Sequence, residues 1–377
     1  MLDPTRRTLR RGLSLCAALA FTFFGGPVAA AGQDPQPAGG ATPPAAQKPE
    51  GRSSPWMLVP MVSSNPKLGT AGGALAAYLH DFDPESRVSI FGVSYQYTST
   101  HSSTAAAFAR ISSGADHHRI VGLGVFGYIK NDYDDYLGTG EPLKTDDDLK
   151  ALAGRYLYRV KGNWFLGAQG TAANYQIFGQ SPEDDLALET LGLVGFKSVA
   201  LGAVVMHDSR DNEDMPTRGW FLNLNNRAYR EGLGGEASFD SYRSDLKVIW
   251  PQRSGHLMAF HQVNWLTYDA PSVAQATIQL RGYKQGQYLA PYMSSFEAEE
   301  RLAFGTRWTA TMFVGVADLY GDPGTAAATT ASRQYFPNWG AGIQFVIKPA
   351  KRMLMNFEYA GGVENNRGGY LKFGYGW

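Results

Sequence analysis

The feature that most constrains this chain is a two-residue alternation of apolar with small or polar side chains. The alternation recurs in segments between positions 56 and 377 that are separated by turn residues, for example at 91–98, 152–160, 339–348 and 353–359. Such a period is that of a β-strand with one apolar face. No stretch of this region has the length and apolarity of a membrane-spanning helix, which needs roughly 20 residues.

The first residues predict export. Four arginines precede an apolar run at 13–24 and a small-residue site at 29–31, which is the order of a cleaved signal peptide. We therefore predict a signal peptide over 1–31. The arginine pair Arg6-Arg7 also fits a twin-arginine signal, which a barrel that folds only in its membrane disfavours. Cys16 suggests a lipoprotein, but the preceding Leu15 is too large for that signal.

Residues 32–54 are rich in Pro, Gly, Ala and Gln, and we predict a disordered periplasmic linker there. Because Cys16 is the only cysteine, the mature chain has no thiol for a disulfide or a metal. Lys plus Arg and Asp plus Glu are 34 each, so no charge excess points to nucleic acid.

An exported chain with alternating segments has few ways to cross a membrane. Only helices and closed barrels satisfy every backbone group inside lipid. We therefore predict that 55–377 is an all-β, transmembrane, antiparallel up-and-down β-barrel in a bacterial outer membrane. A soluble sandwich would also alternate, but it seldom carries so many aromatic residues near the strand ends.

The lengths of the connections support up-and-down threading. Short connections fall at 83–86, 112–118, 161–163, 210–219, 251–255, 305–306 and 349–351, and long ones at 131–148, 177–185, 269–291 and 320–338. Outer-membrane barrels have short periplasmic turns and long extracellular loops. This reading predicts sixteen strands and both chain ends in the periplasm. Fourteen strands stay open, because 186–204 reads as one bent strand or as parts of two.

One turn carries a specific motif: Asp208, Arg210, Asp211 and Asn212, followed by Pro216 and Gly219. Any tight turn collects Asp, Asn, Pro and Gly. The arginine and the order of the whole run resemble the strand-end and turn signature of the BamA/TamA outer-membrane family, the bacterial surface antigen superfamily.

The run Leu280-Arg281-Gly282-Tyr283 is similar to the tip of that family's sixth extracellular loop. The resemblance implies that this loop folds into the lumen and that Arg281 docks on acidic residues of the wall. Glu299 and Asp318 are the residues that match the family's acidic positions. Ordinary lumen polarity is the alternative reading for both. Alternation then points Glu300 at lipid, which is costly there.

The resemblance covers 56–377, from an opening run at 58–74 to an aromatic C-terminus. Phe373, Tyr375 and Trp377 resemble the C-terminal signal that marks outer-membrane barrels for insertion. The segment before the barrel has no room for the POTRA domains that the family usually carries. We therefore expect the barrel alone.

Other sites are weak. The histidines do not converge as metal ligands would, and none is partnered by a serine on its own face. We expect no metal, no cofactor and no enzymatic activity. The aspartates at 132–135 and 146–148 lie in one predicted loop, where they would either bind divalent cations that bridge lipopolysaccharide or keep the loop solvated.

The resemblance implies an insertase or translocase for outer-membrane protein or lipid assembly, acting at a weak seam between the first and last strands. The Gly-rich run at 71–74 is consistent with such a seam. Two alternatives remain: a passive pore for small solutes, and a structural or adhesion barrel. The expected partners are outer-membrane lipids, lipopolysaccharide, and unfolded barrel clients or a separate periplasmic protein, with the chain as a monomer and no nucleic acid.

Overall fold

The computed structural model describes residues 55–373, except 66–68, 134–142, 191–194, 213–215, 253–254, 272–273, 284–287, 322–332, 349–352 and 364–365. The signal peptide and the linker predicted over 1–54 lie outside this range. So do Tyr375 and Trp377 of the predicted insertion signal. Phe373 is the last residue of the last described strand.

The described chain is almost entirely β-structure, as the alternation predicts. The main strands are β1 (Trp56–Asn65), β2 (Gly69–His80), β3 (Ser89–Thr98), β4 (Ser103–Ser113), β5 (His118–Tyr133), β6 (Leu143–Lys161), β7 (Trp164–Gly179), β8 (Lys197–Asp208), β9 (Gly219–Tyr229), β10 (Phe239–Pro251), β11 (Leu257–Tyr268), β14 (Tyr292–Phe304), β15 (Trp308–Tyr320), β16 (Arg333–Lys348), β17 (Met353–Gly362) and β18 (Arg367–Phe373).

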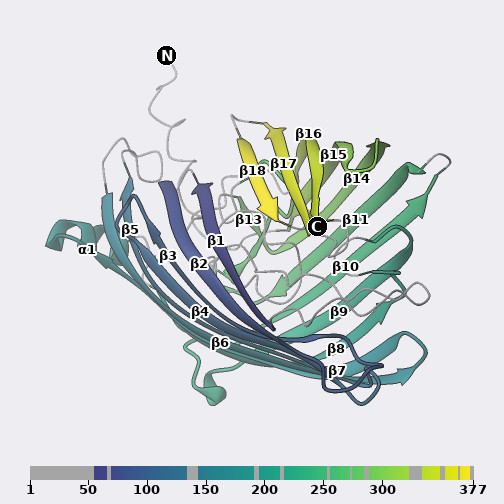
Figure 1. Ribbon diagram of the computed structural model, residues 1–377. Coiled ribbons are helices and arrows are strands. Elements are labelled where there is room, and N and C mark those ends of the chain that lie inside the picture. The colour runs from purple at the N-terminus through teal and green to yellow at the C-terminus, as the bar shows by residue number, and fades with distance from the viewer. Residues whose placement is uncertain are drawn as a thin grey trace.

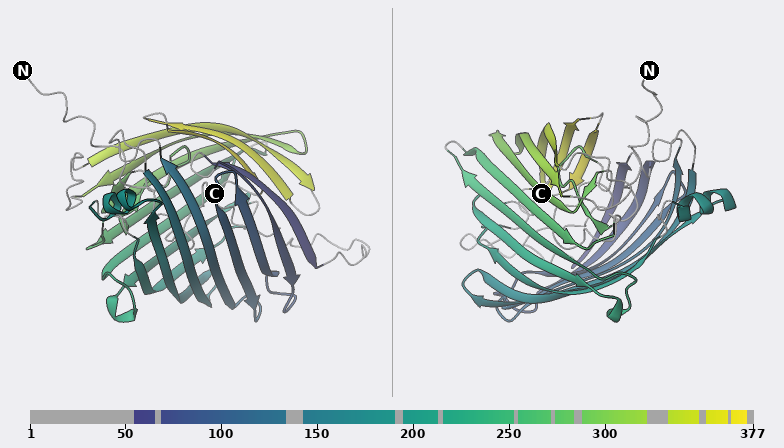
Figure 2. Two further views of the ribbon diagram at one scale, coloured as in Figure 1. Left: turned by 90° about the vertical axis from the view of Figure 1, so that its left-hand side faces the viewer. Right: turned by 180° about the vertical axis from the view of Figure 1, so that it is seen from behind.

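These strands form one sixteen-stranded antiparallel sheet in the described residues, and the spatial order follows the chain order. The predicted number of sixteen is confirmed over fourteen. The sheet curls so that its two edge strands, β1 and β18, face one another on the same side (Figures 1 and 2). The described residues show no ladder between β1 and β18, so backbone closure of the cylinder is not found in this part of the chain.

The two faces of the sheet differ as expected. Val93, Leu152 and Trp339 are exposed on the outer face, while Asn225, Glu297 and Asn356 are buried on the inner face. Outward tyrosines form a ring-to-ring row across β10, β11, β14 and β15. The centroid distances are 5.8 Å for Tyr242–Tyr268, 5.5 Å for Tyr268–Tyr292 and 5.4 Å for Tyr292–Tyr320. Such a row is typical of an interfacial aromatic girdle.

A second outward aromatic group lies at the other ends of the strands. Trp308 packs between Phe304 and Phe345, and Trp164, Trp220 and His207 pack against one another. Tyr292 and Phe304 are the first and last of the thirteen residues of β14. With a rise of about 3.3 Å per residue and a tilt of roughly 40°, the two aromatic groups are ~30 Å apart along the barrel axis. That distance matches the hydrocarbon core of a membrane.

Three predicted loops, at 131–148, 177–185 and 320–338, have wrong boundaries, and in the last of them β16 already begins at Arg333. Asp146, Asp147 and Asp148 lie within β6 and pair with β5 and β7, not in a loop. The region after β7 forms a helix, α1 (Pro182–Thr190), before β8 begins at Lys197. Where a strand continues past the apolar band, its outward side chains are polar like its inward ones. Apolar and polar residues then no longer alternate, and the sequence pattern resembles that of a loop. No described helix is both long and apolar enough to cross a membrane.

Candidate functional site

The connection between β11 and β14 enters the cylinder. It contains a small hairpin of β12 (Ala276–Thr277) and β13 (Leu289–Ala290). Its apolar side chains, Ile278 and Leu280 among them, share a buried cluster with Val263, Trp265 and Met293 of the wall. A loop that only covered the mouth would be exposed. This loop is packed as a core element.

Arg281 is held at the loop tip by three carboxylates of the inner wall. Its Nε and Nη2 donate to Oε1 of Glu297 at 3.0 and 2.5 Å. Its Nη1 lies 2.9 Å from Oε1 of Glu358 and 2.7 Å from Oε2 of Glu299. The guanidinium carbon lies 3.4 Å from the ring centroid of Phe313. Each of the three guanidinium nitrogens therefore has a carboxylate partner, the geometry that suits arginine and not lysine.

Further polar groups complete this buried network. Nε of Arg301 donates to Glu299 at 2.6 Å, and Nδ2 of Asn338 donates to Glu297 at 2.7 Å. Nδ2 of Asn356 donates to Glu358 at 2.7 Å. Three carboxylates thus share two guanidiniums and two amides. Removal of one cation would leave buried negative charge without compensation, which is costly.

The two residues after Arg281 fix the loop against β16, β18 and the residue that follows β17. Gly282 has φ +93°, which favours glycine. Its N–H donates to the hydroxyl of Tyr370 at 2.8 Å. The hydroxyl of Tyr283 donates to the carbonyl of Pro337 at 2.6 Å and accepts from the N–H of Val363 at 3.1 Å. A Cβ on Gly362 would lie 2.4 Å from Tyr283, so the bare backbone there makes room for the ring.

The structure brings Arg281 together with Glu299, as expected from the resemblance, but not with Asp318. Ala317 and Leu319 of β15 are buried in the lumen, so their neighbour Asp318 lies on the outer face. Gly315 and Asp318 are three residues apart, and an odd separation changes the face of a strand. Glu297 and Glu358 take the expected place of Asp318. Glu300 lies on the outer face, as predicted.

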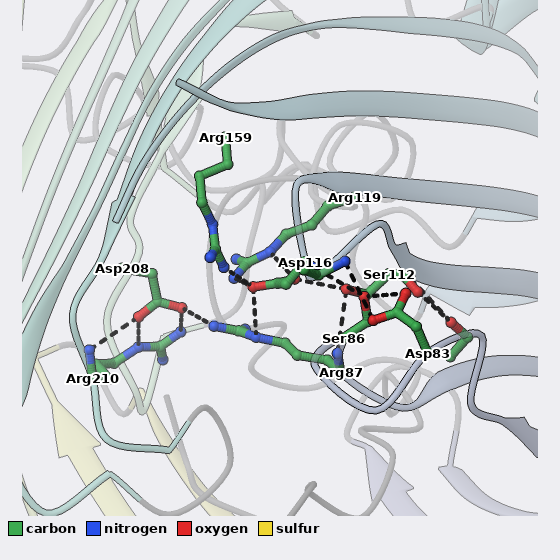
Figure 3. Close-up of polar contacts among 11 residues, drawn as sticks. Asp83, Ser86, Arg87, Ser112, Asp116, Arg119, Arg159, Asp208 and Arg210 are labelled. Carbon is green, nitrogen blue, oxygen red and sulfur yellow. Dashed lines mark hydrogen bonds and ion pairs between the residues drawn. The ribbon is translucent and has the colours of Figure 1, made fainter. Parts of the chain in front are cut away.

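A second polar network joins side chains at or beside four short connections, those that follow β2, β4, β6 and β8 (Figure 3). Asp116 accepts from Nε and Nη2 of Arg119 at 2.8 and 2.6 Å and from Oγ of Ser112 at 2.6 Å. Nη2 of Arg159 also pairs with Asp116. Arg87 lies 3.6 Å from both Asp116 and Asp208, and so it links the two carboxylates. We call Arg87, Asp116, Arg119, Arg159, Asp208 and Arg210 the turn cluster.

The predicted turn motif belongs partly to this cluster. Arg210 donates from Nε to Asp208 at 2.9 Å. Asp211 instead shapes the turn, since it accepts from the N–H of Thr217 at 2.8 Å. Gly219 has φ +104°, and a Cβ there would lie 2.4 Å from the carbonyl of Ser209. Asn212 and Pro216 are buried. The motif therefore combines an ion pair with a tight turn.

Burial alone would raise the pKa of Asp116. The hydrogen bond and charge of Arg119, the hydrogen bond of Ser112 and the charge of Arg87 outweigh burial and lower the pKa to about 2. Burial, together with repulsion from Arg119, lowers the pKa of Arg87 to about 10, against the attraction of Asp208 and Asp116. Both groups therefore stay charged at neutral pH.

The turn cluster predicts a specific pH dependence. The pKa of Asp116 is lower in the folded chain than its ordinary value of 3.8, so its stabilising effect is complete above that value and disappears as the pH falls towards 2. We expect the stability difference between the parent chain and Asp116→Asn to be constant from about pH 7 to pH 5 and to shrink between about pH 4 and pH 2. Urea unfolding in detergent, followed by gel mobility without boiling, measures it. A difference that stays constant down to pH 2 would contradict this assignment.

Metal ligation has no candidate in the part of the chain described. No group of three or more His, Cys, Asp or Glu side chains is arranged there to hold an ion. Of the acidic residues predicted in a loop, Asp134 and Asp135 lie outside the described residues. Asp147 is buried and accepts from Thr145 at 2.9 Å.

Comparisons with known proteins bear on the fold. No protein-family model and no curated protein matches the chain. Among solved structures, it is similar to BamA from Haemophilus ducreyi lacking POTRA domains 1–3, with a TM-score of 0.55, 13% identity, and coverage of 85% of this chain and 69% of that chain.

It is also similar to two CdiB structures. For CdiB from Escherichia coli the TM-score is 0.63, the identity 11%, and the coverage 86% of this chain and 63% of that one. For CdiB from Acinetobacter baumannii these values are 0.58, 11%, 85% and 59%. The resemblance predicted from the motifs is confirmed as a likeness of barrel fold. The chain spans between 59% and 69% of the length of these structures.

Proposed function

With the barrel fold of BamA and CdiB as the premise, we propose that this chain is an outer-membrane barrel that assists the assembly or translocation of other envelope components. The observation that carries the proposal is a pair of edge strands, β1 and β18, that share no ladder in the described residues, beside a loop that Arg281 holds in the lumen. An edge strand offers unpaired N–H and C=O groups to an incoming strand. The ion pairs of Arg281 with Glu297, Glu299 and Glu358 keep this loop in the lumen while a client strand pairs at the edge.

The seam favours exchange over permanent closure. In the described residues β1 pairs with β2 alone, and the stretch of β2 that faces it from Pro60 to Ser63 is Ala71-Gly72-Gly73-Ala74. Side chains this small add little cross-strand packing, so displacement by a client strand costs less at β1. β17 and β18 stay fixed meanwhile, because Glu358 binds Arg281, the N–H of Val363 donates to Tyr283, and Tyr370 accepts from the N–H of Gly282. The exchange is therefore confined to the β1 side of the seam.

The same argument indicates which partners the chain would have. Outer-membrane phospholipid and lipopolysaccharide would contact the outer aromatic surface. Unfolded barrel proteins would pair at the seam, and a separate periplasmic protein would supply client capture. The chain would act as a monomer, since pairing of two seams would block the client site.

Depletion tests this function. We expect that depletion of the chain in its native host lowers the outer-membrane level of at least one other barrel protein or lipid class by twofold or more. Quantitative proteomics and lipid analysis of isolated outer membranes measure this. Restoration by the parent chain, but not by Arg281→Ala, is the matched comparison. Unchanged levels of every other component would reject assembly and favour the passive pore, for which a polar lumen suffices.

A further inference from the structure

Three arginines lie near one another in the lumen, on a different part of the wall from the glutamates that bind Arg281. Arg155 of β6, Arg227 of β9 and Arg243 of β10 are 9%, 5% and 5% exposed. Each pair among them is close enough for electrostatic repulsion. We call these three residues the lumen basic cluster. Strands β6 to β9 lie across the cylinder from β16 to β18 (Figure 1), so the cluster is part of another wall than Glu358.

A chain of amides connects the cluster. Nη2 of Arg155 donates to Oε1 of Gln169 at 2.6 Å, and Nε2 of Gln169 donates to Oδ1 of Asn225 at 3.0 Å. Asn225 is the register partner of Arg243. Nη2 of Arg243 then donates at 3.0 Å to Oε1 of Gln279. Gln279 belongs to the connection between β11 and β14, which we call the docked loop. The amide oxygens of Gln169, Asn225 and Gln279 are thus already used as acceptors.

These side chains also carry donors that have no acceptor in the described part of the chain. Within the described residues, Nε of Arg227, Nε of Arg243, Nδ2 of Asn225 and Nε2 of Gln279 are buried and make no hydrogen bond. The amide orientations of Asn225 and Gln279 are fixed, because each oxygen receives a donor. A buried donor without an acceptor costs about 1–3 kcal/mol. Four together imply an acceptor that the protein itself does not contribute.

Basic groups also outnumber acidic ones around these donors. Asp245 attracts Arg243, but it also attracts Lys247 and lies 3.2 Å from Nε2 of His261. One carboxylate is thus shared by several basic groups. A water molecule could accept two of the four hydrogen bonds. Its own two protons would then lack acceptors, because the unpaired groups around it are donors. An oxyanion only accepts, and it also neutralises charge.

We propose that the lumen basic cluster, with Asn225 and Gln279, is a binding site for an oxyanion of the phosphate class. The proposal rests on the barrel interior and not on the assembly function. Arg227, Arg243 and the two amides donate to the anion, and Arg155 supplies long-range attraction. Because Gln279 belongs to the docked loop, the anion also ties that loop to β10, on the side away from Glu358. The source of the phosphate is either a free solute or a lipid headgroup.

Titration calorimetry of the full chain in nonionic detergent tests the site, with inorganic phosphate as one probe and dihexanoyl phosphatidic acid as the other. We expect saturable binding of inorganic phosphate at constant ionic strength, weakened at least tenfold in Arg227→Gln/Arg243→Gln. Lys150→Gln/Lys161→Gln, which removes two exposed cations, should bind as the parent does. Tighter binding of the lipid than of inorganic phosphate assigns the site to a headgroup, and the reverse assigns it to a solute.

A second variant guards against misfolding. Asn225→Ala/Gln279→Ala keeps every charge and should weaken binding threefold or more, while its gel mobility without boiling stays that of a folded barrel. The proposal is overturned if neither probe binds the parent chain. It is also overturned if the arginine variant, shown to be folded by its mobility, binds with the parent's affinity.

Discussion

Replacement of Arg281 by alanine should destabilise the barrel more than any other single change in the lumen. The substitution leaves Glu297, Glu299 and Glu358 buried beside one another with only Arg301 to compensate them. Breaking a buried ion pair in this way costs about 3–5 kcal/mol. We expect the temperature at which the folded gel band disappears to fall by at least ten degrees. In planar bilayers, the conductance should rise and fluctuate, because the loop tip no longer holds its place.

Two controls separate charge from packing. Arg281→Lys keeps the charge but loses the bidentate contacts, and should recover only part of the stability. Arg281→Ala/Glu297→Gln removes one of the orphaned charges and should be more stable than Arg281→Ala alone. The docked-loop assignment fails if Arg281→Ala matches the parent chain in both conductance and mobility.

The second large effect is expected at the turn cluster. Asp116→Asn removes the carboxylate that Arg119, Arg159 and Arg87 share. Those arginines come from three different connections or strands, so their mutual repulsion would separate the ends of β3, β5 and β6. Arg87 and Arg159 are partly exposed, and solvent screening reduces the loss. We expect a destabilisation of about 2–3 kcal/mol at neutral pH.

Asp83→Asn is the matched control, since Asp83 also lies in a short connection but its carboxylate accepts from Ser86 and not from an arginine. That change should cost clearly less than Asp116→Asn does. Urea unfolding in detergent at pH 7 measures both variants. Equal effects of the two substitutions would contradict the claim that shared charge, and not turn geometry, gives Asp116 its role.

Much of the barrel could be predicted from the sequence because a strand has a rigid period. Once one residue of β14 is assigned to the lumen, Glu297, Glu299 and Arg301 follow, and Glu300 must face outward. The same rule exposes the error at Asp318. The family pattern that Asp318 was matched to has one residue between its glycine and its aspartate, whereas this chain has two between Gly315 and Asp318, and the additional residue reverses the face. A match of residue types therefore has to respect parity before it can predict a contact.

Contacts between distant strands could not be predicted in the same way. Glu358 is on the inner face by alternation, but only the path of the loop between β11 and β14 brings Arg281 to it, across 77 positions. The turn cluster has the same origin. Asp116 and Arg159 are 43 positions apart and meet because the ends of β5 and β6 lie side by side. Neither residue stands in a motif that marks it.

The docked loop joins two walls of unlike charge at positions only two residues apart. Gln279 contacts Arg243, and Arg281 contacts the glutamates of β14 and β17. A single withdrawal of this segment would expose both walls at once. The emptied channel would then hold a transverse electric field, and a flexible polyampholyte passing through would be oriented by its own charges. Under the proposed translocation function, passage would depend on charge order along the cargo as well as on its width.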